Sequence, residues 1–355
     1  MYWQSSFTTR DGTLIEWGTG DHNSNGDNGV REYSPITRTQ TYVYPNNNGT
    51  RDVTQYDNHL YWYIPRIDSL VIPSRGQYAR ASRSWVRGEN ASFFPNGPHV
   101  IGSGSNDLLR PVGSVDVVSL QSSYNSHAAW STQFDAGVAI GGCGGCEKDA
   151  RPLIWLVVPG QGVGSSPQPY AVVQRTLPSS VNGAAPNLSN GRDGCCFLGE
   201  YVYWVGGTSS GTTTLVPHFF RMRISPHLFS TSAPLTIERL PDAPAAFKMG
   251  LLRADPYTNA LLCVSDMGIF VYDVTGGSWI VVTPSGYTAD YAKSPANGHL
   301  PAGCLGDFID GSGGQTLRRF YWRAGRSGAW STDGADTPPE MTRQFRSIKL
   351  ARRSS

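Results

Sequence analysis

The clearest pattern in the chain is a series of short apolar runs separated by turns rich in Gly, Pro, Asn and Ser. Examples are Leu70–Ile72, Leu153–Val158 and Leu261–Val264. Runs of strand length that recur at intervals of roughly 8–12 residues predict an all-β array. We expect about six such units, the first over Ser5–Pro45 and the last beginning near Pro301.

Two of these units repeat one aromatic spacing. Tyr78 is followed by Trp85, and Tyr272 by Trp279, seven residues later in each case. Each pair comes after an apolar run and a polar turn, so both units read as strand, turn, strand, turn, strand. Self-similarity of this kind predicts a β-repeat protein. It indicates the fold more than the function, because β-repeat scaffolds host many unrelated activities.

The composition agrees with a turn-rich fold. The chain of 355 residues contains 41 glycines and 24 prolines, and only 16% of its residues are charged. A formal net charge of +2 implies no strong attraction to nucleic acid or to an anionic membrane. The apolar runs are too short to span a bilayer. The segment Met1–Gln4 shows no export signal, so cytosolic synthesis is expected if Met1 is the native start.

Glycine doublets add a family resemblance. Gly141–Gly142 and Gly206–Gly207 each end an apolar run, and with the two Tyr/Trp spacings they resemble the marks of kelch-type β-propellers, as in the central domain of galactose-oxidase-like proteins. The resemblance implies one all-β propeller over residues 1–350, with about six or seven four-stranded blades and a short basic tail at 351–355. It also implies a blade completed by both chain ends, for which Phe345–Leu350 is the candidate closing strand.

One loop matches a calcium-binding pattern. The stretch from Asp21 to Glu32 fits D-x-[DN]-x-[DN]-G-x5-E at every required position. Calcium takes several hard oxygen ligands. The candidates here are Asp21, Asn23, Asn25, Asp27 and Glu32. The flanks look like strands and not like the helices of an EF-hand, so a plain Asn/Gly-rich turn is the alternative.

A basic and aromatic stretch in the second unit is the candidate binding site. Its members can stack on sugars or bases and hold an anionic group. They are Tyr61, Trp62, Arg66, Arg75 and Tyr78. Packing between blades is the alternative explanation of the aromatic residues.

Catalytic and further metal motifs are weak. Cys143 and Cys146 have the spacing of a zinc half-site, but a second half-site is missing. We find no clustered histidines, no nucleophile elbow, no phosphate-binding loop, and no spacing that singles out a galactose-oxidase-like copper site. Aspartates near the unit starts could approach a propeller axis, although turn positions are the alternative: Asp57, Asp135, Asp193, Asp255 and Asp307.

These observations predict a non-enzymatic binding or assembly module that contacts a protein partner or a glycan through its loops. A phage virion component, in the tail or on the capsid surface, would suit this style of sequence. The alternatives are a carbohydrate-active hydrolase or lyase with its site at one mouth of the propeller, and an intracellular adaptor. We assign no catalytic residue and no certain cofactor, with Ca²⁺ as the candidate.

Overall fold

A computed structural model describes most of the strands and turns of the chain. The described residues are 6–17, 30–34, 37, 39–44, 60–74, 76–88, 98–102, 106–121, 126–142, 151–160, 170–188, 194–209, 212, 214–228, 230, 232–247, 250–265, 267–283, 285, 303–309, 316–323 and 345–349. In this part the structure is almost entirely β, with one short helix, α1 (Val117–Gln121), and two 3-10 turns, η1 (Pro65–Ile67) and η2 (Ser225–His227). The expected all-β class is confirmed.

The strands form six sheets, numbered here in chain order. The first contains β1 (Ser6–Thr8), β2 (Leu14–Trp17), β3 (Val30–Ser34) and β4 (Thr39–Tyr44). The second contains β5 (Trp62–Ile64), β6 (Ser69–Ile72), β7 (Gly76–Ala79) and β8 (Ser84–Gly88). The third contains β10 (His127–Ser131), β11 (Ala136–Ile140), β12 (Leu153–Pro159) and β13 (Tyr170–Thr176), with β9 (Leu109–Pro111) added in parallel to β13.

The remaining sheets follow the same meander. The fourth contains β14 (Cys195–Leu198), β15 (Tyr201–Val205), β16 (Phe219–Arg223) and β17 (Ile237–Leu240). The fifth contains β18 (Gly250–Asp255), β19 (Ala260–Ser265), β20 (Gly268–Asp273) and β21 (Ser278–Val281). The sixth contains β22 (Gly303–Ile309), β23 (Thr316–Arg323) and β24 (Phe345–Lys349).

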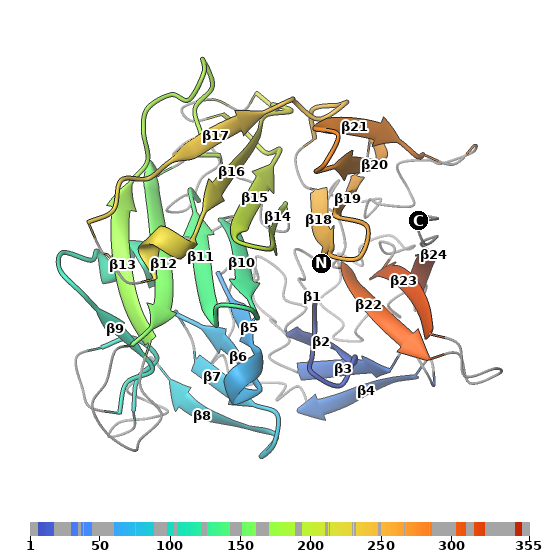
Figure 1. The fold of residues 1–355 in the computed structure, drawn as a ribbon. Coiled ribbons are helices and arrows are strands. Elements are labelled where there is room, and N and C mark those ends of the chain that lie inside the picture. The colour runs from blue at the N-terminus through green and yellow to red at the C-terminus, as the bar shows by residue number, and fades with distance from the viewer. Residues whose placement is uncertain are drawn as a thin grey trace, which may run out of the picture.

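The sheets are arranged around a centre like the blades of a propeller (Figure 1). Strands β1, β5, β10, β14, β18 and β22 lie innermost. β10 contacts both β5 and β14, while β18 contacts β14 and β22. β22 in turn contacts β1, which brings the first and the sixth sheets together. The expected single propeller-like fold is therefore present.

The hydrophobic core lies between neighbouring sheets, which explains why the strands read as continuous apolar runs. In β15, Val202 and Trp204 pack towards the third sheet, whereas Tyr203 and Val205 pack towards the fifth. In β6, Leu70 and Ile72 face the first sheet and Val71 the third. Successive side chains of a strand point to opposite faces, so a sheet with neighbours on both sides needs apolar residues at every position.

The turn between the first and second strands repeats one backbone conformation in five sheets. One residue in each turn has a positive φ: Gly12 (79°), Asp68 (48°), Asp135 (50°), Gly199 (57°) and Asn259 (51°). Gly, Asn and Asp are the residue types that adopt this left-handed conformation at least cost. Each of them comes one or two residues before an apolar strand, so the turn chemistry and the strand pattern agree.

The two Tyr/Trp spacings occupy equivalent places in the second and fifth sheets. Tyr78 of β7 pairs across the strands with Trp85 of β8, and Tyr272 of β20 with Trp279 of β21. The ring centroids lie 5.8 Å and 5.1 Å apart. In both sheets the pair packs towards the preceding sheet. The spacing therefore marks two strands joined by a tight turn.

The glycine doublets are also equivalent. Both glycines of each doublet have a positive φ, at the end of β11 and of β15. The Gly142 N–H donates to the Leu188 carbonyl, and the Gly207 N–H donates to the Phe247 carbonyl at 3.0 Å. A Cβ on Gly141 would lie 2.2 Å from the Leu188 oxygen. Each doublet thus fastens the end of a second strand to the segment that leads into the next sheet.

Two expectations about the blades need correction. Four sheets have four strands, but the third has five and the sixth has three among the described residues. The proposed closing strand Phe345–Leu350 corresponds to β24, which pairs with β23 and not with a strand from the N-terminal end. The ring closes instead through contact between β1 and β22, each within its own sheet. The basic tail at 351–355 lies outside the described residues.

Candidate functional site

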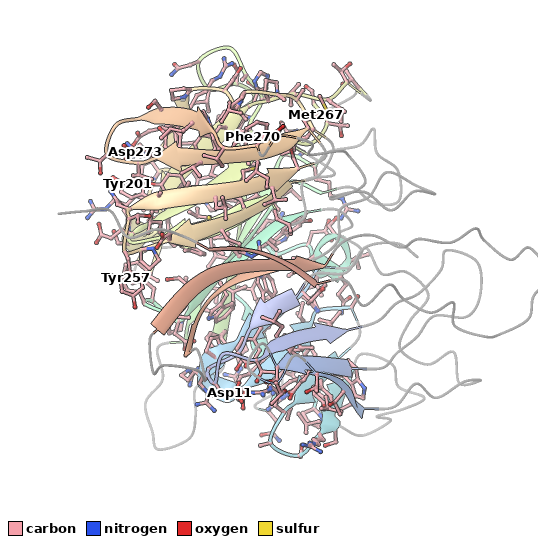
Figure 2. All side chains as sticks on the ribbon, turned by 90° about the vertical axis from the view of Figure 1, so that its right-hand side faces the viewer. Asp11, Tyr201, Tyr257, Met267, Phe270 and Asp273 are labelled. Carbon is pink, nitrogen blue, oxygen red and sulfur yellow. The ribbon has the colours of Figure 1, made fainter. Side chains whose placement is uncertain are left out.

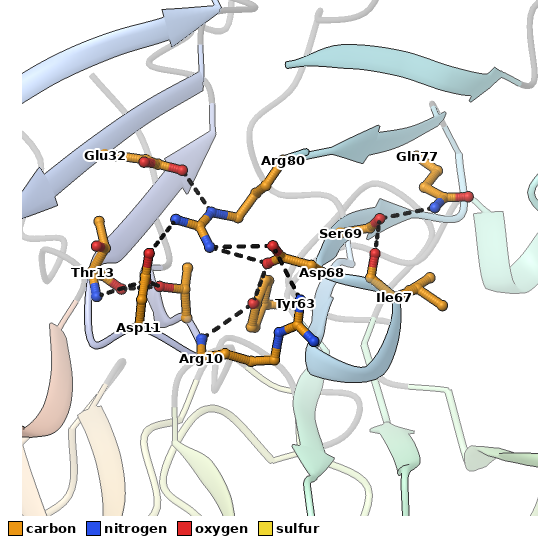
Figure 3. A network of polar contacts seen from close by, with 11 residues as sticks. Arg10, Asp11, Thr13, Glu32, Tyr63, Ile67, Asp68, Ser69, Gln77 and Arg80 are labelled. Carbon is orange, nitrogen blue, oxygen red and sulfur yellow. Dashed lines mark hydrogen bonds and ion pairs between the residues drawn. The ribbon is translucent and has the colours of Figure 1, made fainter. Parts of the chain in front are cut away.

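A cluster of charged residues lies between the first and second sheets, with Arg80 at its centre (Figure 3). Arg80 follows β7, and its side chain is only 12% exposed. Its guanidinium donates to Glu32 of β3 at 2.6 Å, to Asp68 at 3.1 Å and to Asp11 of the β1–β2 turn at 3.1 Å. One cation thus binds three carboxylates from two sheets.

Tyr63 and Arg10 complete this cluster. The Tyr63 hydroxyl donates to Asp68 at 2.5 Å and accepts a hydrogen bond from the Arg10 backbone N–H at 3.3 Å. The Arg10 side chain, which is mostly exposed, lies 3.5 Å from Asp68. Burial and the neighbouring Asp68 carboxylate raise the pKa of Tyr63 to about 12. The phenol is therefore a hydrogen-bond donor at neutral pH and not a base.

The charges of the cluster stabilise one another. Burial alone would raise the pKa of Asp11, but hydrogen bonds from Thr9 and Arg80 outweigh it and hold that pKa well below its ordinary value. The pKa of Asp68 is lowered in the same way, because hydrogen bonds from Tyr63 and Arg80 overcome its burial. Burial would lower the pKa of Arg80, yet its carboxylate partners raise it. The cluster stays ionised at neutral pH, and its geometry suits fastening the two sheets together.

A second cluster fastens the second sheet to the third. Arg66 of η1 forms an ion pair with Asp135 in the β10–β11 turn, and its guanidinium lies 4.8 Å from the centre of the Tyr170 ring. The Tyr170 hydroxyl donates to Asp135 at 2.8 Å and accepts from Arg66 at 3.1 Å. Burial, followed by the charge of Asp135, raises the pKa of Tyr170. The turn that contains η1 thus supplies Asp68 to one cluster and Arg66 to the other.

A third polar group lies at the edge of the fourth sheet. His218 Nδ1 is 3.3 Å from both carboxylate oxygens of Asp242, and Arg239 also donates to Asp242 at 2.9 Å. Arg239 reaches the Asn182 carbonyl at 2.7 Å as well. Because Arg239 links the fourth sheet to the segment that follows the third, this group has the same sheet-fastening geometry as the other two.

Exposed apolar side chains gather on the fifth sheet. Ile280, Val281 and Val282, in and after β21, are 49%, 62% and 42% exposed, and Met267 is 57% exposed. Figure 2 shows Met267 and Tyr257 at opposite ends of this sheet, and both side chains are exposed. Contiguous apolar patches are a feature of interaction surfaces.

The predicted binding residues do not form one surface. Tyr61, Trp62 and Tyr78 are buried in the cores between sheets, as the packing alternative expects. The Trp62 indole N–H donates to the Val138 carbonyl of the third sheet at 3.0 Å. Arg66 is partly exposed and pairs with Asp135. Arg75 lies outside the described residues.

The predicted calcium ligands are described only at Glu32, which lies on β3 and accepts from Arg80. Asp21, Asn23, Asn25 and Asp27 lie outside the described residues, as do Cys143 and Cys146. The residues that the structure describes contain no group of three or more His, Cys, Asp or Glu placed to hold a metal ion. The calcium site stays a prediction.

Three of the aspartates near unit starts can be placed. Asp307 lies within β22 and is paired in register with Arg318 of β23, whereas Asp255 and Asp135 serve turns. Asp255 accepts hydrogen bonds from the Tyr257 N–H at 3.1 Å and the Thr258 hydroxyl at 2.6 Å. Asp135 has a left-handed backbone in its turn and pairs with Arg66. Our sequence reasoning missed Asp68 as a member of any site. A signal for it existed, because Asp68 directly precedes the apolar strand β6, like Asp135 before β11.

The chain matches no known family in the comparison with protein families, and no curated protein matches it significantly. No helix among the described residues is both long and apolar enough to cross a membrane.

Proposed function

We propose that the protein is a non-enzymatic binding or assembly module. The observation that carries this proposal is the uneven distribution of exposed apolar side chains. Eight large hydrophobic residues are exposed in the described part of the chain, and five of them belong to the fifth sheet or follow it directly: Tyr257, Met267, Ile280, Val281 and Val282. Scattered apolar residues need no explanation, but a concentration of them on one sheet favours an interface.

We further propose a kelch-like propeller with six blades as the scaffold of this module. The innermost strands β5, β10, β14, β18, β22 and β1 contact one another in that order, and four of the sheets have the four-stranded meander. The glycine doublets end second strands, and the Tyr/Trp pairs join third and fourth strands. These equivalent positions support a kelch-like propeller, although no single sheet carries both a glycine doublet and a Tyr/Trp pair.

The polar clusters favour a binding function because their charged groups already pair with one another across neighbouring sheets. Arg80 has carboxylates of two sheets as partners, and Arg66 connects the second and third sheets. A scaffold fastened in this way presents its surface with little loss of conformational freedom on binding. The partner is a protein surface or a glycan. Membership of a phage virion stays a hypothesis that mass spectrometry of purified particles can test.

The test combines a binding assay with a turnover assay on the full chain. We expect the protein to bind a member of a glycan array or a component of its source particle, and to release no product from a panel of polysaccharides. Met267→Lys should weaken that binding at least tenfold, while Leu215→Lys, at an exposed apolar position in the connection between β15 and β16, should leave it unchanged. New reducing ends or unsaturated sugars would establish the carbohydrate-active enzyme instead.

A further inference from the structure

Among the described strands, the outer strand β21 has a pairing partner on one side only. It ends the fifth sheet, whose order is β18-β19-β20-β21. Three successive aliphatic residues, Ile280 to Val282, are exposed on it. Among the side chains that the structure describes, no other outer strand exposes such a run. An open, apolar strand edge is a template for pairing with another chain.

Three of the other outer strands, β17, β8 and β13, are protected against such pairing. β17 carries Glu238 and Arg239, and β8 carries Arg87. The outer side of β13 is covered by β9, which pairs with it in parallel. Charged side chains and covering segments are the usual means of keeping an edge unpaired. The stretch Ser278–Thr283 contains no charged residue and no proline, and no described strand covers it.

The hydrogen-bond register shows which backbone groups face the open side. The Val282 N–H donates to the Ile269 carbonyl of β20 at 3.0 Å. Backbone groups of successive residues point to opposite sides of an antiparallel strand. The backbone groups of Ile280 therefore face β20 as well, while Trp279 and Val281 direct their backbone N–H and C=O groups away from the sheet.

We propose that β21 pairs antiparallel with β21 of a second copy of this chain, across a two-fold axis at Val281. This register sets Val281 against Val281 of the second copy, and Ile280 against its Val282. Apolar side chains then meet apolar side chains on both faces of the joined sheet, which stabilises antiparallel pairs. The inference rests on the proposed assembly function and names its partner.

Charge is compatible with this partner. An isologous contact brings each residue near its own symmetry mate, so a charge in the strand would repel itself. The nearest acidic residue among the described residues of the sheet is Asp273, which pairs with Ser278, three residues from Val281. At about 3.3 Å per residue, the two Asp273 carboxylates would lie roughly 20 Å apart, beyond the screening length at physiological salt.

The contact is small, so we expect reversible self-association. A few ladder hydrogen bonds and three aliphatic residues on each side put the interface below the ~1,200 Å² of stable complexes. Sedimentation velocity over about two decades of concentration should show a monomer–dimer equilibrium, with a dissociation constant in the micromolar range or weaker.

Variants at the two-fold axis test the geometry. Val281→Lys places two like charges together, and Val281→Pro removes the outward N–H without touching the ladder to β20. Both should weaken the dimer at least tenfold. Val281→Thr keeps the N–H and the branched shape and should retain most of it. Val118→Lys, at an exposed valine of helix α1 outside the fifth sheet, is the matched control and should have no effect.

Thermal unfolding followed by circular dichroism establishes that each variant is folded. A wild-type protein that stays monomeric throughout, or a dimer that Val281→Lys and Val281→Pro leave unchanged, overturns the inference. In either case binding to a glycan or to the source particle, lost in Met267→Lys, would leave the proposed function standing.

Discussion

Replacing Arg80 by methionine tests whether the charged cluster holds the first and second sheets together. The substitution keeps an unbranched side chain but leaves Glu32, Asp68 and Asp11 without their shared cation. Removing one partner of a buried ion pair costs about 3–5 kcal/mol. Because Asp11 is mostly exposed and water can reach that side of the cluster, we expect a value near the lower end, about 3 kcal/mol.

This loss of free energy converts into a measurable shift of Tm. The unfolding entropy of a chain of 355 residues is about 0.75 kcal/mol/K, at ~2.1 cal/mol/K per residue. We therefore expect Tm to fall by about 4 °C in differential scanning calorimetry. Arg223→Met is the control, since Arg223 pairs with Glu200 at 2.6 Å where both side chains are over 40% exposed. Exposed pairs contribute only ~0.2–1 kcal/mol, so its Tm should fall by about 1 °C.

The pH dependence gives an independent readout of the same cluster. The pKa values of Asp11 and Asp68 are held below the ordinary 3.8 in the folded protein. Their contribution is therefore present above that pH and is lost as the pH falls below it. The gap between wild type and Arg80→Met should narrow as the pH falls from 5 to 3. Equal losses in the Arg80 and Arg223 variants, or a gap independent of pH, would refute this account of the cluster.

Three further predictions follow from other parts of the molecule. Gly141→Ala should cost about 3 kcal/mol in denaturant titrations, because its Cβ would meet the Leu188 carbonyl, whereas Gly199→Ala, with no atom within 4 Å, should cost only the ~1 kcal/mol of a left-handed backbone. Burial lowers the pKa of His127 from 6.5 to about 3, so the unfolded chain takes up the proton first. Stability should fall between those pH values, by on the order of 2 kcal/mol at pH 5, and His127→Gln should flatten this slope. Elemental analysis after dialysis should find retained Ca²⁺ if the Asp21–Glu32 loop binds it, and its absence would exclude that site.

The strands were predictable because they are locally encoded. The runs Leu70–Ile72 and Leu261–Val264 fall within β6 and β19, and the Tyr78/Trp85 spacing corresponds to a cross-strand pair. Strand β9 was not predicted, since three residues ending in a proline give no periodic signal. It forms only because the outer edge of β13 offers it a partner about 60 residues away in the chain.

The candidate sites were less predictable. The sequence placed Arg66 in a binding stretch with Tyr61 and Trp62, but the structure buries both aromatic rings and pairs Arg66 with Asp135. Glu32 was a candidate calcium ligand, and its described partner is Arg80, 48 residues away. Contacts of this kind depend on which sheets become neighbours, and a local pattern contains no information on that.

The sequence by itself determined the all-β class, the positions of most strands and the turns between them, because strand periodicity and left-handed turn residues act within a few positions of the chain. Only the tertiary structure decided which charges meet between sheets, how the ring closes through β1 and β22, and which outer strand stays open. Burial on both faces makes the inner strands look alike in sequence. The exposure of Ile280 to Val282 on β21 emerges only when every other sheet has taken its place.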